Sequence, residues 1–427
     1  MHTTYEHSVL LDESKCTGCT ACLKHCPTEA IRIKNGHAVI NSTRCIDCGE
    51  CIRVCPHQAK KAIFGKISNM ERFKWKIALP APTLYGQFDN LDDIDYVLNG
   101  LLAIGFDDVY EVAKAAELVS AYTRLYLKLE GVTKPAISSA CPAVVRLISL
   151  RFPSLADHVI HMLPPMEIAA KLAKDKALRE HPELKPEDIG VCFISPCPAK
   201  VSYIKNGFGP RKSLVDEVIS VKDAYFLLIG KMKKDEEIKH LTESGRIGIG
   251  WSRSGGEATA ILNDNYLAAD GIDNVIHVLD LIENGTIPPL DFIELNACTG
   301  GCVGGVSTIQ NPFVAKARML TLRRYLPISQ NNILKEDSYI PDYFLFEDMP
   351  SYAPITRLSD SIAESMRIMA DIQKFKQKLP GIDCGSCGAP NCRAFAEDVM
   401  RNRASADDCP IITARRIKNE KELKDEG

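Results

Sequence analysis

The residues of this chain best suited to chemistry are its cysteines, which number 17 among 427 residues. They are clustered, because eight precede residue 56 and four lie between residues 384 and 409. The first ten residues lack the apolar core of a signal peptide, so we expect a soluble, cytoplasmic protein. The cytosol keeps thiols reduced, which disfavours a disulfide framework. Clustered cysteines in such a chain indicate metal ligands or catalytic thiols.

The first cluster of cysteines is an internal repeat. The pattern C-x2-C-x2-C-x3-C-P occupies residues 16–27 and returns 29 positions later at residues 45–56. In this pattern the fourth cysteine of each run ligates the other cluster, so two 4Fe–4S clusters with crossed ligand sets are expected. The expected ligands of the first are Cys16, Cys19, Cys22 and Cys55. Those of the second are Cys45, Cys48, Cys51 and Cys26. Paired C-x2-C spacings also bind zinc, which is the alternative.

The last cluster of cysteines has a different spacing, x2, x4 and x16, and comprises Cys384, Cys387, Cys392 and Cys409. Gly385 and Gly388 let the backbone approach an inorganic sulfide closely. The segment resembles a small iron–sulfur domain found in membrane-associated electron-transfer subunits and in some hydrogenases. The resemblance implies a third 4Fe–4S cluster, with zinc again as the alternative.

Between these clusters, short aliphatic runs alternate with longer helical stretches. This alternation is typical of an α/β fold with parallel sheets covered by helices. We expect strands at residues 76–79, 108–112, 136–138, 189–194, 247–249 and 291–295. We expect helices at residues 113–129, 166–179 and 358–378, and a charged, solvated helix end at residues 415–427.

Three domains follow from this organisation. Residues 1–66 are expected to form a bacterial-type ferredoxin domain with two 4Fe–4S clusters. Residues 67–356 are expected to form a two-lobed α/β domain with parallel sheets. Residues 357–427 are expected to form a small helical iron–sulfur domain.

Five cysteines remain in the middle of the chain, and four of them follow, or nearly follow, a predicted strand. Ligands of open parallel sheets bind beyond the carboxyl ends of the strands. The four could therefore converge, and four thiolates are the number that a cubane cluster needs. They are Cys141, Cys197, Cys298 and Cys302. Cys192 lies inside a strand, and we assign it a buried structural role.

The residues around these four cysteines carry a family resemblance. The segments at residues 138–142, 195–200 and 292–305 read SSACP, SPCPAK and FIELNACTGGCVGG. They resemble, in order and separation, the three signatures of iron-only (FeFe) hydrogenases. Together with the ferredoxin-like start and the final cysteine cluster, the resemblance spans nearly the whole chain.

The resemblance implies an H-cluster in residues 67–356, which is a 4Fe–4S cube joined to a two-iron unit carrying CO, cyanide and an azadithiolate. Cys141, Cys197 and Cys298 would ligate the cube, and Cys302 would bridge both parts. Lys200 would hydrogen-bond one cyanide, and the Ala81-Pro82-Thr83 turn would bind the other. Glycines of the third signature, Gly301 among them, would leave room for the cofactor. The resemblance also places Ala140, Ser195, Pro196 and Asn296 around it.

The chain departs from the well-known catalytic members of this family at four motif positions. Where those members have a proton-relaying cysteine before the first ligand, this chain has Ala140, which cannot carry a proton. Ser195 and Asn296 replace methionines, and Tyr203 replaces a glutamate. Such departures resemble the sensory branches of the family. We consider four substitute proton carriers, each with a structural role as the alternative: Glu294, Glu167, Cys192 and Tyr203.

Four functions are compatible with these features. The first two are a slow hydrogenase, which interconverts H2 with protons and electrons, and a hydrogen sensor with the same cofactor. The others are a hydrogenase-like assembly protein and an electron carrier, both without the two-iron unit. Three accessory clusters would exchange electrons with a ferredoxin or another redox protein. Assembly would need H-cluster maturation proteins, and a sensor would need a signalling partner or a homodimer. The net charge of -3 and the short apolar runs exclude nucleic acid and a membrane span from the expected partners.

Overall fold

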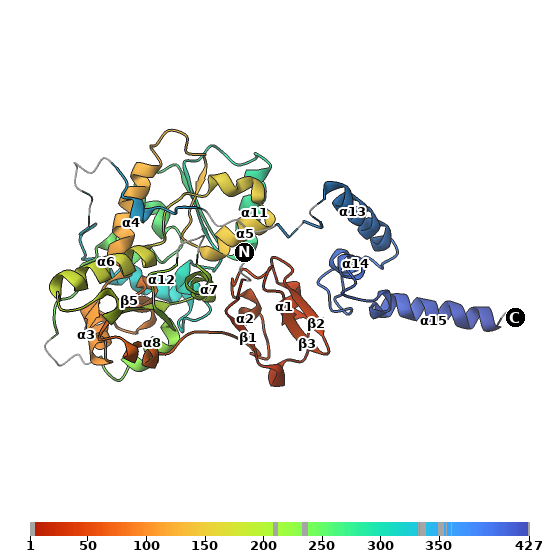
Figure 1. The fold of residues 1–427 in the computed structure, drawn as a ribbon, viewed down its shortest axis with the longest axis horizontal. Helices are drawn as coiled ribbons and strands as arrows, with labels where there is room; N and C mark the ends of the chain where they lie inside the picture. Colours follow the sequence, from red (N-terminus) through yellow and green to blue (C-terminus); the bar gives the residue numbers. More distant parts are fainter. Residues whose placement is uncertain are drawn as a thin grey trace.

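The N-terminal unit consists of two small antiparallel sheets and two short helices, and it faces both other parts of the molecule (Figure 1). The computed structural model describes residues 5–207, 212–232, 238–331, 333, 339–348, 354–355, 357–359 and 361–425. Strand β1 (Val9–Leu11) pairs with β4 (Lys60–Ala62), and β2 (Ile31–Lys34) pairs with β3 (His37–Ile40). Helices α1 (Ala21–Lys24) and α2 (Glu50–Arg53) carry the third cysteine of each repeat.

The larger sheet of the central unit has the order β6-β5-β8-β9, and all its strands are parallel. Its strands are β5 (Trp75–Pro80), β6 (Asp108–Val109), β8 (Ile189–Ser195) and β9 (Glu217–Ser220). Every residue of β8 is buried, as expected for a parallel strand covered on both faces. The helices around this sheet are α3 (Asp95–Ala103), α4 (Val112–Tyr126), α6 (Pro165–Glu180), α7 (Pro198–Asn206) and α8 (Val221–Leu228).

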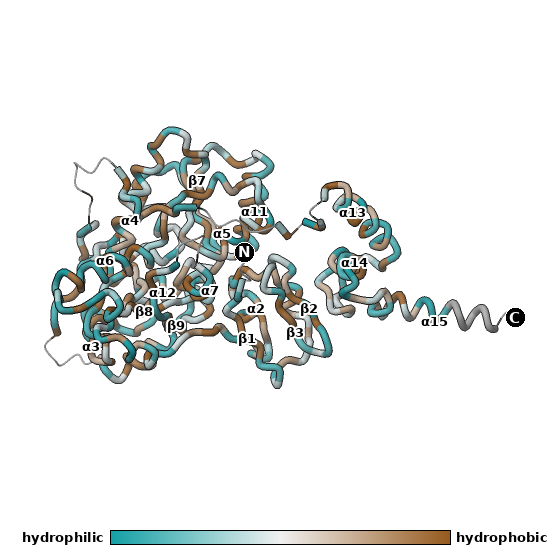
Figure 2. The backbone as a smooth tube through the Cα atoms, in the orientation of Figure 1, coloured by the Kyte–Doolittle hydropathy of each residue, from teal (hydrophilic) through white to brown (hydrophobic). Residues whose placement is uncertain are grey.

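The smaller sheet is also parallel and has the order β10-β11-β7. Its strands are β7 (Ala136–Ile137), β10 (Tyr266–Asp270) and β11 (Phe292–Asn296). Its helices are α5 (Pro142–Arg151), α10 (Gly256–Ala260) and α11 (Ile272–Glu283), with α12 (Pro312–Leu322) following. Helix α5 is apolar along most of its length (Figure 2), and eight of its ten residues are buried. The two parallel sheets confirm the predicted α/β class.

Most predicted elements agree with the structure, but the predicted strand at residues 247–249 is wrong. These residues lie in helix α9 (Arg246–Gly250), which packs on α4. A Cβ at Gly248 would lie 2.2 Å from the carbonyl oxygen of Ala113, so glycine permits this close helix contact. Strands β9 and β10 were not predicted.

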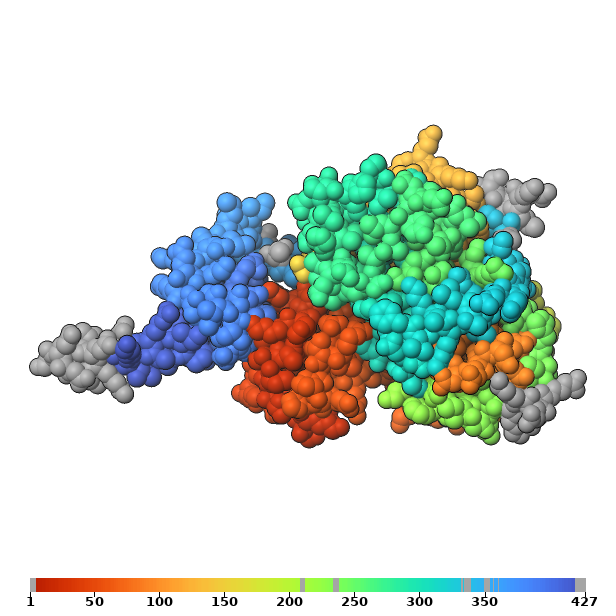
Figure 3. All heavy atoms as spheres, turned by 180° about the vertical axis from the view of Figure 1, so that it is seen from behind, coloured from red at the N-terminus to blue at the C-terminus, as the bar shows by residue number. Residues whose placement is uncertain are grey.

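The C-terminal unit lies beside the N-terminal unit and away from most of the central one (Figure 1; from behind, Figure 3). It contains α13 (Ile362–Lys376), α14 (Cys392–Met400) and α15 (Pro410–Asp425). Helices α13 and α15 agree with the predicted helix and helix end, whereas α14 was not predicted. Ile372, Leu379 and Phe395 form the centre of its small core. The predicted domain boundary at residue 356 lies outside the described residues. No helix among the described residues is long and apolar enough to cross a membrane.

Candidate functional site

The structure brings four of the five central cysteines to one place. Cys141 and Cys197 precede the first turns of α5 and α7, immediately beyond their sheets. Cys298 follows β11, and Cys302 begins a short 3-10 turn, Cys302–Gly304. The thiol of Cys197 interacts electrostatically with the other three and with Lys200. Burial raises the pKa of the Cys197 thiol and raises that of Cys298 to about 11. The neighbouring cysteines act in the same direction, whereas Lys200 acts to lower the pKa of Cys197 and Arg53 acts to lower that of Cys298. Buried thiols with raised pKa values need a cationic partner to become thiolates.

Lys200 supplies one positive charge at this place. It is 9% exposed, and its Nζ lies 3.6 Å from Sγ of Cys302. Burial acts to lower the pKa of Lys200, but the thiolates of Cys302, Cys197 and Cys141 outweigh it and raise the pKa. The ammonium group therefore stays charged inside the protein.

A buried cavity adjoins this group and contains the turn predicted to bind the cofactor. Ala81, Pro82 and Thr83 line it together with Ala140, Lys200 and Cys302. The hydroxyl of Thr83 is fully buried and makes no hydrogen bond within the described part of the chain. Buried hydroxyls are almost always hydrogen-bonded, so this one indicates a missing partner. The residues fit a ligand that is anchored at Cys302, hydrogen-bonds to Thr83 and carries negative charge toward Lys200.

The remaining residues predicted to bind the cofactor are not among those that line the cavity; they are Ser195, Pro196, Asn296 and Gly301. Ser195 Oγ accepts a hydrogen bond from the backbone N–H of Cys197 at 3.3 Å. Pro196 packs against Gly305, where a Cβ would lie 2.4 Å from the Pro196 carbonyl oxygen. At Gly301, which has φ +87°, a Cβ would lie 2.5 Å from the backbone nitrogen of Ser254. These glycines therefore permit close backbone packing, rather than leaving open space as the sequence suggested.

Two buried glutamates, one on the smaller sheet and one on a neighbouring helix, interact electrostatically. Glu294 on β11 accepts hydrogen bonds from the backbone N–H groups of Gly255 and Ala258, at 3.0 and 2.8 Å, and from Asn296 Nδ2 at 2.6 Å. Burial raises the pKa of Glu294 to about 7. Glu257 on α10 has its pKa raised to about 8 by burial and then by the charge of Glu294. Two such carboxyls hold at least one proton between them near neutral pH.

Ser138 connects this pair to the cavity. Its Oγ donates to Glu257 at 2.6 Å and accepts from the backbone N–H of Ala140 at 3.1 Å. Ala140 is one of the residues that line the cavity. The predicted proton carrier Glu294 thus has a second glutamate, Glu257, as its partner. Sequence analysis did not identify Glu257, because a single glutamate in a five-residue helix belongs to no recognisable motif.

The other three candidate proton carriers lie away from the cavity at Cys302, in surroundings that indicate a structural role. Glu167 accepts hydrogen bonds from Ser213 Oγ at 2.5 Å and from the backbone N–H of Leu214 at 3.0 Å. It shares a separate cavity with Tyr203. Cys192 is fully buried in β8, and burial raises the pKa of its thiol. None of the three is among the residues that line the cavity at Cys302.

The N-terminal cysteines line two cavities, and each cavity has cysteines from both repeats. One is lined by Cys16, Cys19, Cys22 and Cys55. The other is lined by Cys26, Cys45, Cys48 and Cys51. Each cavity thus takes the fourth cysteine of the other repeat, which is the arrangement expected of two adjacent 4Fe–4S clusters.

The C-terminal cysteines also lie near one another. Cys387 interacts electrostatically with Cys409 and Cys384. Hydrogen bonds from Ser386 lower the pKa of the exposed Cys384 thiol. Donors of this kind stabilise a thiolate, as an iron–sulfur cluster requires. No three histidine, cysteine or acidic side chains in the described ranges are close enough to share a single metal ion.

Arg53 joins the ferredoxin-like unit to the central cysteines, and the sequence did not single it out. It lies on α2 between Cys51 and Cys55, and its Nη2 donates to the carbonyl oxygen of Gly304 at 2.8 Å. Burial acts to lower the pKa of Arg53, but the Cys298 thiol and Glu50 outweigh it and raise the pKa. At the neighbouring Gly49, with φ +78°, a Cβ would lie 2.8 Å from the side chain of Val306.

Comparison with known proteins gives three matches to family models. The model of the iron only hydrogenase large subunit, C-terminal domain, matches residues 74–266 and 256–306. A 4Fe-4S dicluster domain matches residues 8–56, and a model described as "Putative Fe-S cluster" matches residues 379–411.

Among curated proteins, a periplasmic Fe hydrogenase large subunit of Nitratidesulfovibrio vulgaris is 26% identical over 381 residues, covering 74% of this chain and 90% of that protein. An uncharacterized protein of Methanocaldococcus jannaschii is 36% identical over 58 residues, covering 13% of this chain and 26% of its own.

Among solved structures, an FeFe-hydrogenase variant from Chlamydomonas reinhardtii has a TM-score of 0.50 at 15% identity, covering 66% of this chain and 95% of its own. A structure concerned with oxygen inactivation of an FeFe-hydrogenase has a TM-score of 0.51 at 15% identity, covering 68% and 97%. At this identity the structures support the likeness of fold.

Proposed function

We propose that this chain, which belongs to the family of iron-only hydrogenase large subunits, interconverts H2 with two protons and two electrons at an H-cluster. The observation that carries the proposal is the cavity beside Cys302. There a charged, buried lysine and an unpartnered threonine hydroxyl face a space bounded by a cysteine from the family's third signature.

Four cysteines would hold the cofactor in this proposal. Cys141, Cys197 and Cys298 would ligate the 4Fe–4S cube, and Cys302 would join the cube to the two-iron unit. When bound, the two-iron unit supplies an open iron position and a bridging amine for the cleavage of H2. Lys200 would donate a charge-assisted hydrogen bond to one cyanide of the unit. Thr83 would donate a hydrogen bond from its hydroxyl to the other cyanide, so that both cyanides of the unit are held in position.

Protons would pass through the buried glutamate pair. Ala140 has no titratable atom, so the relay used by the well-known catalytic members is interrupted here. The Glu257 carboxyl accepts a hydrogen bond from Ser138, whose hydroxyl accepts one from the backbone N–H of Ala140. With pKa values raised to about 8 and 7, Glu257 and Glu294 can both gain and release a proton near neutral pH. We therefore assign Glu294 and Glu257 as proton carriers, with turnover slowed by the gap at Ala140.

Electrons would leave singly through the accessory clusters to a ferredoxin or another redox protein. Slow turnover also suits a hydrogen sensor, and the loss of the relay cysteine at Ala140 is the observation that favours this second function. An assembly protein or a plain electron carrier would not need Lys200 and Thr83 around a cavity beside Cys302.

The experiment is H2 evolution from reduced viologen by protein matured with the family's assembly machinery. We expect weak but measurable activity that Cys302→Ala abolishes. Cys192→Ala is the matched control, because Cys192 is equally central but buried inside β8, and it should retain most of the activity. If fully loaded protein shows no activity, or if both variants fall equally, the proposal is wrong.

A further inference from the structure

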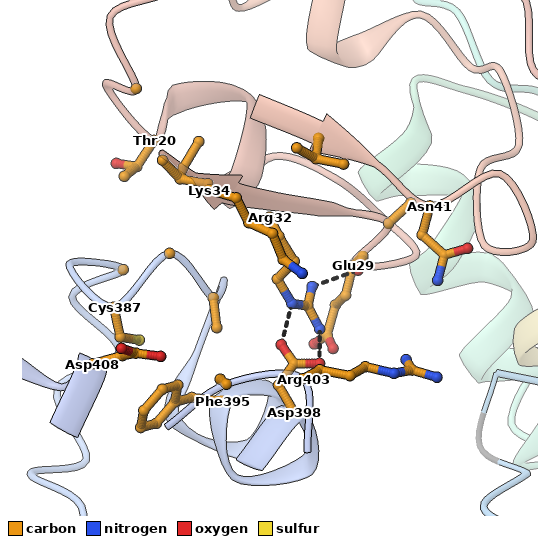
Figure 4. Close-up of a pocket in the computed structure, with 18 of the residues that line it drawn as sticks. Thr20, Glu29, Arg32, Lys34, Asn41, Cys387, Phe395, Asp398, Arg403 and Asp408 are labelled. Carbon is orange, nitrogen blue, oxygen red and sulfur yellow. Dashed lines mark hydrogen bonds and ion pairs between the residues drawn. The ribbon is translucent and has the colours of Figure 1, made fainter. Parts of the chain in front are cut away.

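The C-terminal unit docks on one end of the ferredoxin-like unit through directional contacts. The Arg32 side chain pairs with Asp398, and Arg44 Nη2 lies 2.6 Å from Glu397 Oε1. Both acidic residues are buried and belong to α14. Figure 4 shows Arg32 pointing from the ferredoxin-like unit toward Asp398. Buried, paired charges hold a fixed geometry, because breaking one pair leaves the other charge uncompensated. The two units therefore have a defined relative position.

The cysteine loops of the two units meet at this interface. The backbone N–H of Ile33 donates to the carbonyl oxygen of Gly388 at 2.9 Å. A Cβ at Gly388 would lie only 2.3 Å from the Ile33 carbonyl oxygen, and one at Gly18 would lie 3.4 Å from the Ile33 side chain. Gly388 follows Cys387, and Gly18 precedes Cys19. Ile33 thus lies between the turn at Gly388 of the C-terminal cysteine loop and the turn at Gly18 of the first repeat.

Lys24 makes a second connection between the same two loops. It lies between Cys22 and Cys26, and its Nζ donates to the carbonyl oxygens of Asp383 and Pro390, the latter at 2.8 Å. These residues flank the segment that holds Cys384 and Cys387.

The other end of the ferredoxin-like unit faces the central cysteines. The second repeat contacts the segment that follows Cys302, through Gly49 against Val306 and Arg53 against Gly304. Lys24 of the first repeat thus contacts the C-terminal unit, whereas Gly49 and Arg53 of the second repeat contact the segment beside the central cysteines.

We infer that the C-terminal cluster exchanges electrons directly with the cluster of Cys16, Cys19, Cys22 and Cys55, across Ile33. The clusters then form one linear series, from the C-terminal cluster through the first and second ferredoxin-type clusters to the cube. Each step moves one electron, so one cluster is oxidised as its neighbour is reduced. The inference rests on the cluster assignments of the proposed function, but not on hydrogenase activity.

The test is electron paramagnetic resonance of reduced protein that carries its 4Fe–4S clusters but lacks the two-iron unit. Two adjacent reduced clusters are paramagnetic, and we expect magnetic splitting of the C-terminal signal. Cys387→Ala should remove that signal together with the part of the splitting of the first ferredoxin-type cluster that the C-terminal cluster causes. Absence of hydrogenase activity in matured protein would overturn the proposed function while leaving this result unchanged.

Interface variants make the test specific. Arg32→Glu should abolish the splitting without loss of iron, and the double variant Arg32→Glu/Asp398→Arg should restore it. Arg367→Glu, on the exposed side of α13, is the matched control and should leave the splitting unchanged. An unsplit C-terminal signal in the wild type, splitting that survives Arg32→Glu, or zinc in place of iron at the C-terminal cysteines would each overturn the inference.

Discussion

Replacing Arg53 with glutamine should lower the reduction potential of the cube held by Cys298. The guanidinium interacts with the Cys298 thiol, donates to Gly304 at 2.8 Å and pairs with Glu50 at 2.8 Å. Hydrogen bonds to charged groups contribute about 1.5–3 kcal/mol. The Arg53 side chain is 35% exposed, so we reduce this to about 1 kcal/mol for solvent screening. A positive donor favours the more negative, reduced cluster. For a one-electron couple, a tenfold change in equilibrium constant is about 59 mV, so the expected decrease is about 40 mV.

The assay is a redox titration of the cube by electron paramagnetic resonance, in protein without the two-iron unit. Arg53→Lys keeps the charge and should shift the potential less than Arg53→Gln does. Glu50→Gln leaves Arg53 in contact with Gly304 and serves as the control. If Arg53→Gln has its full cluster content and the same cube potential as the wild type, the proposed effect of Arg53 on the Cys298 thiolate is refuted.

Three further outcomes follow from the glutamate pair and its neighbours. Ala140→Cys should raise the rate of H2 evolution if proton delivery limits turnover, and an unchanged rate with full cofactor loading would contradict this. Glu294→Gln should lower H2 evolution at least tenfold, since a proton carrier contributes roughly 10²–10⁴-fold, and should flatten the pH–rate profile near pH 7. The raised pKa of Glu257, about 8 against an ordinary 4.5, favours its neutral form in the folded protein. The contribution of Glu257 to the free energy of unfolding is therefore fully present below pH 4.5, and it is lost as the pH rises through 8. Thermal melts should show this loss in the wild type and a weaker one in Glu257→Gln.

The grouping of the N-terminal cysteines around two cavities was predictable, because these cysteines belong to a local sequence pattern. The repeats at residues 16–27 and 45–56 specify their cavities through spacing alone. The central cysteines were predictable because three of them follow buried strands, and parallel strands present their carboxyl ends at one edge. Short aliphatic runs in the sequence already indicate these parallel strands. The strands in turn explain why Cys141 and Cys302, which are far apart in the sequence, lie close together.

The features that were not predictable depend on contacts without a local pattern. Residues 247–249 look like a strand, because periodicity cannot distinguish a short apolar run of a helix from one of a strand. Strand β10 was missed because it is only half-buried and contains two alanines. The roles of Glu257 and Arg53 depend on partners far away in the sequence, Ser138 and Gly304, which only the folded chain brings into contact.

The most direct test of the central claim is infrared spectroscopy of the protein matured with the family's assembly machinery. Iron-bound CO and cyanide absorb where the polypeptide does not, so their bands report the two-iron unit itself. The account predicts these bands in the wild type, their loss in Cys302→Ala, and a shift of the cyanide bands in Thr83→Val. Protein that contains its 4Fe–4S clusters but shows no such bands after maturation would contradict the account.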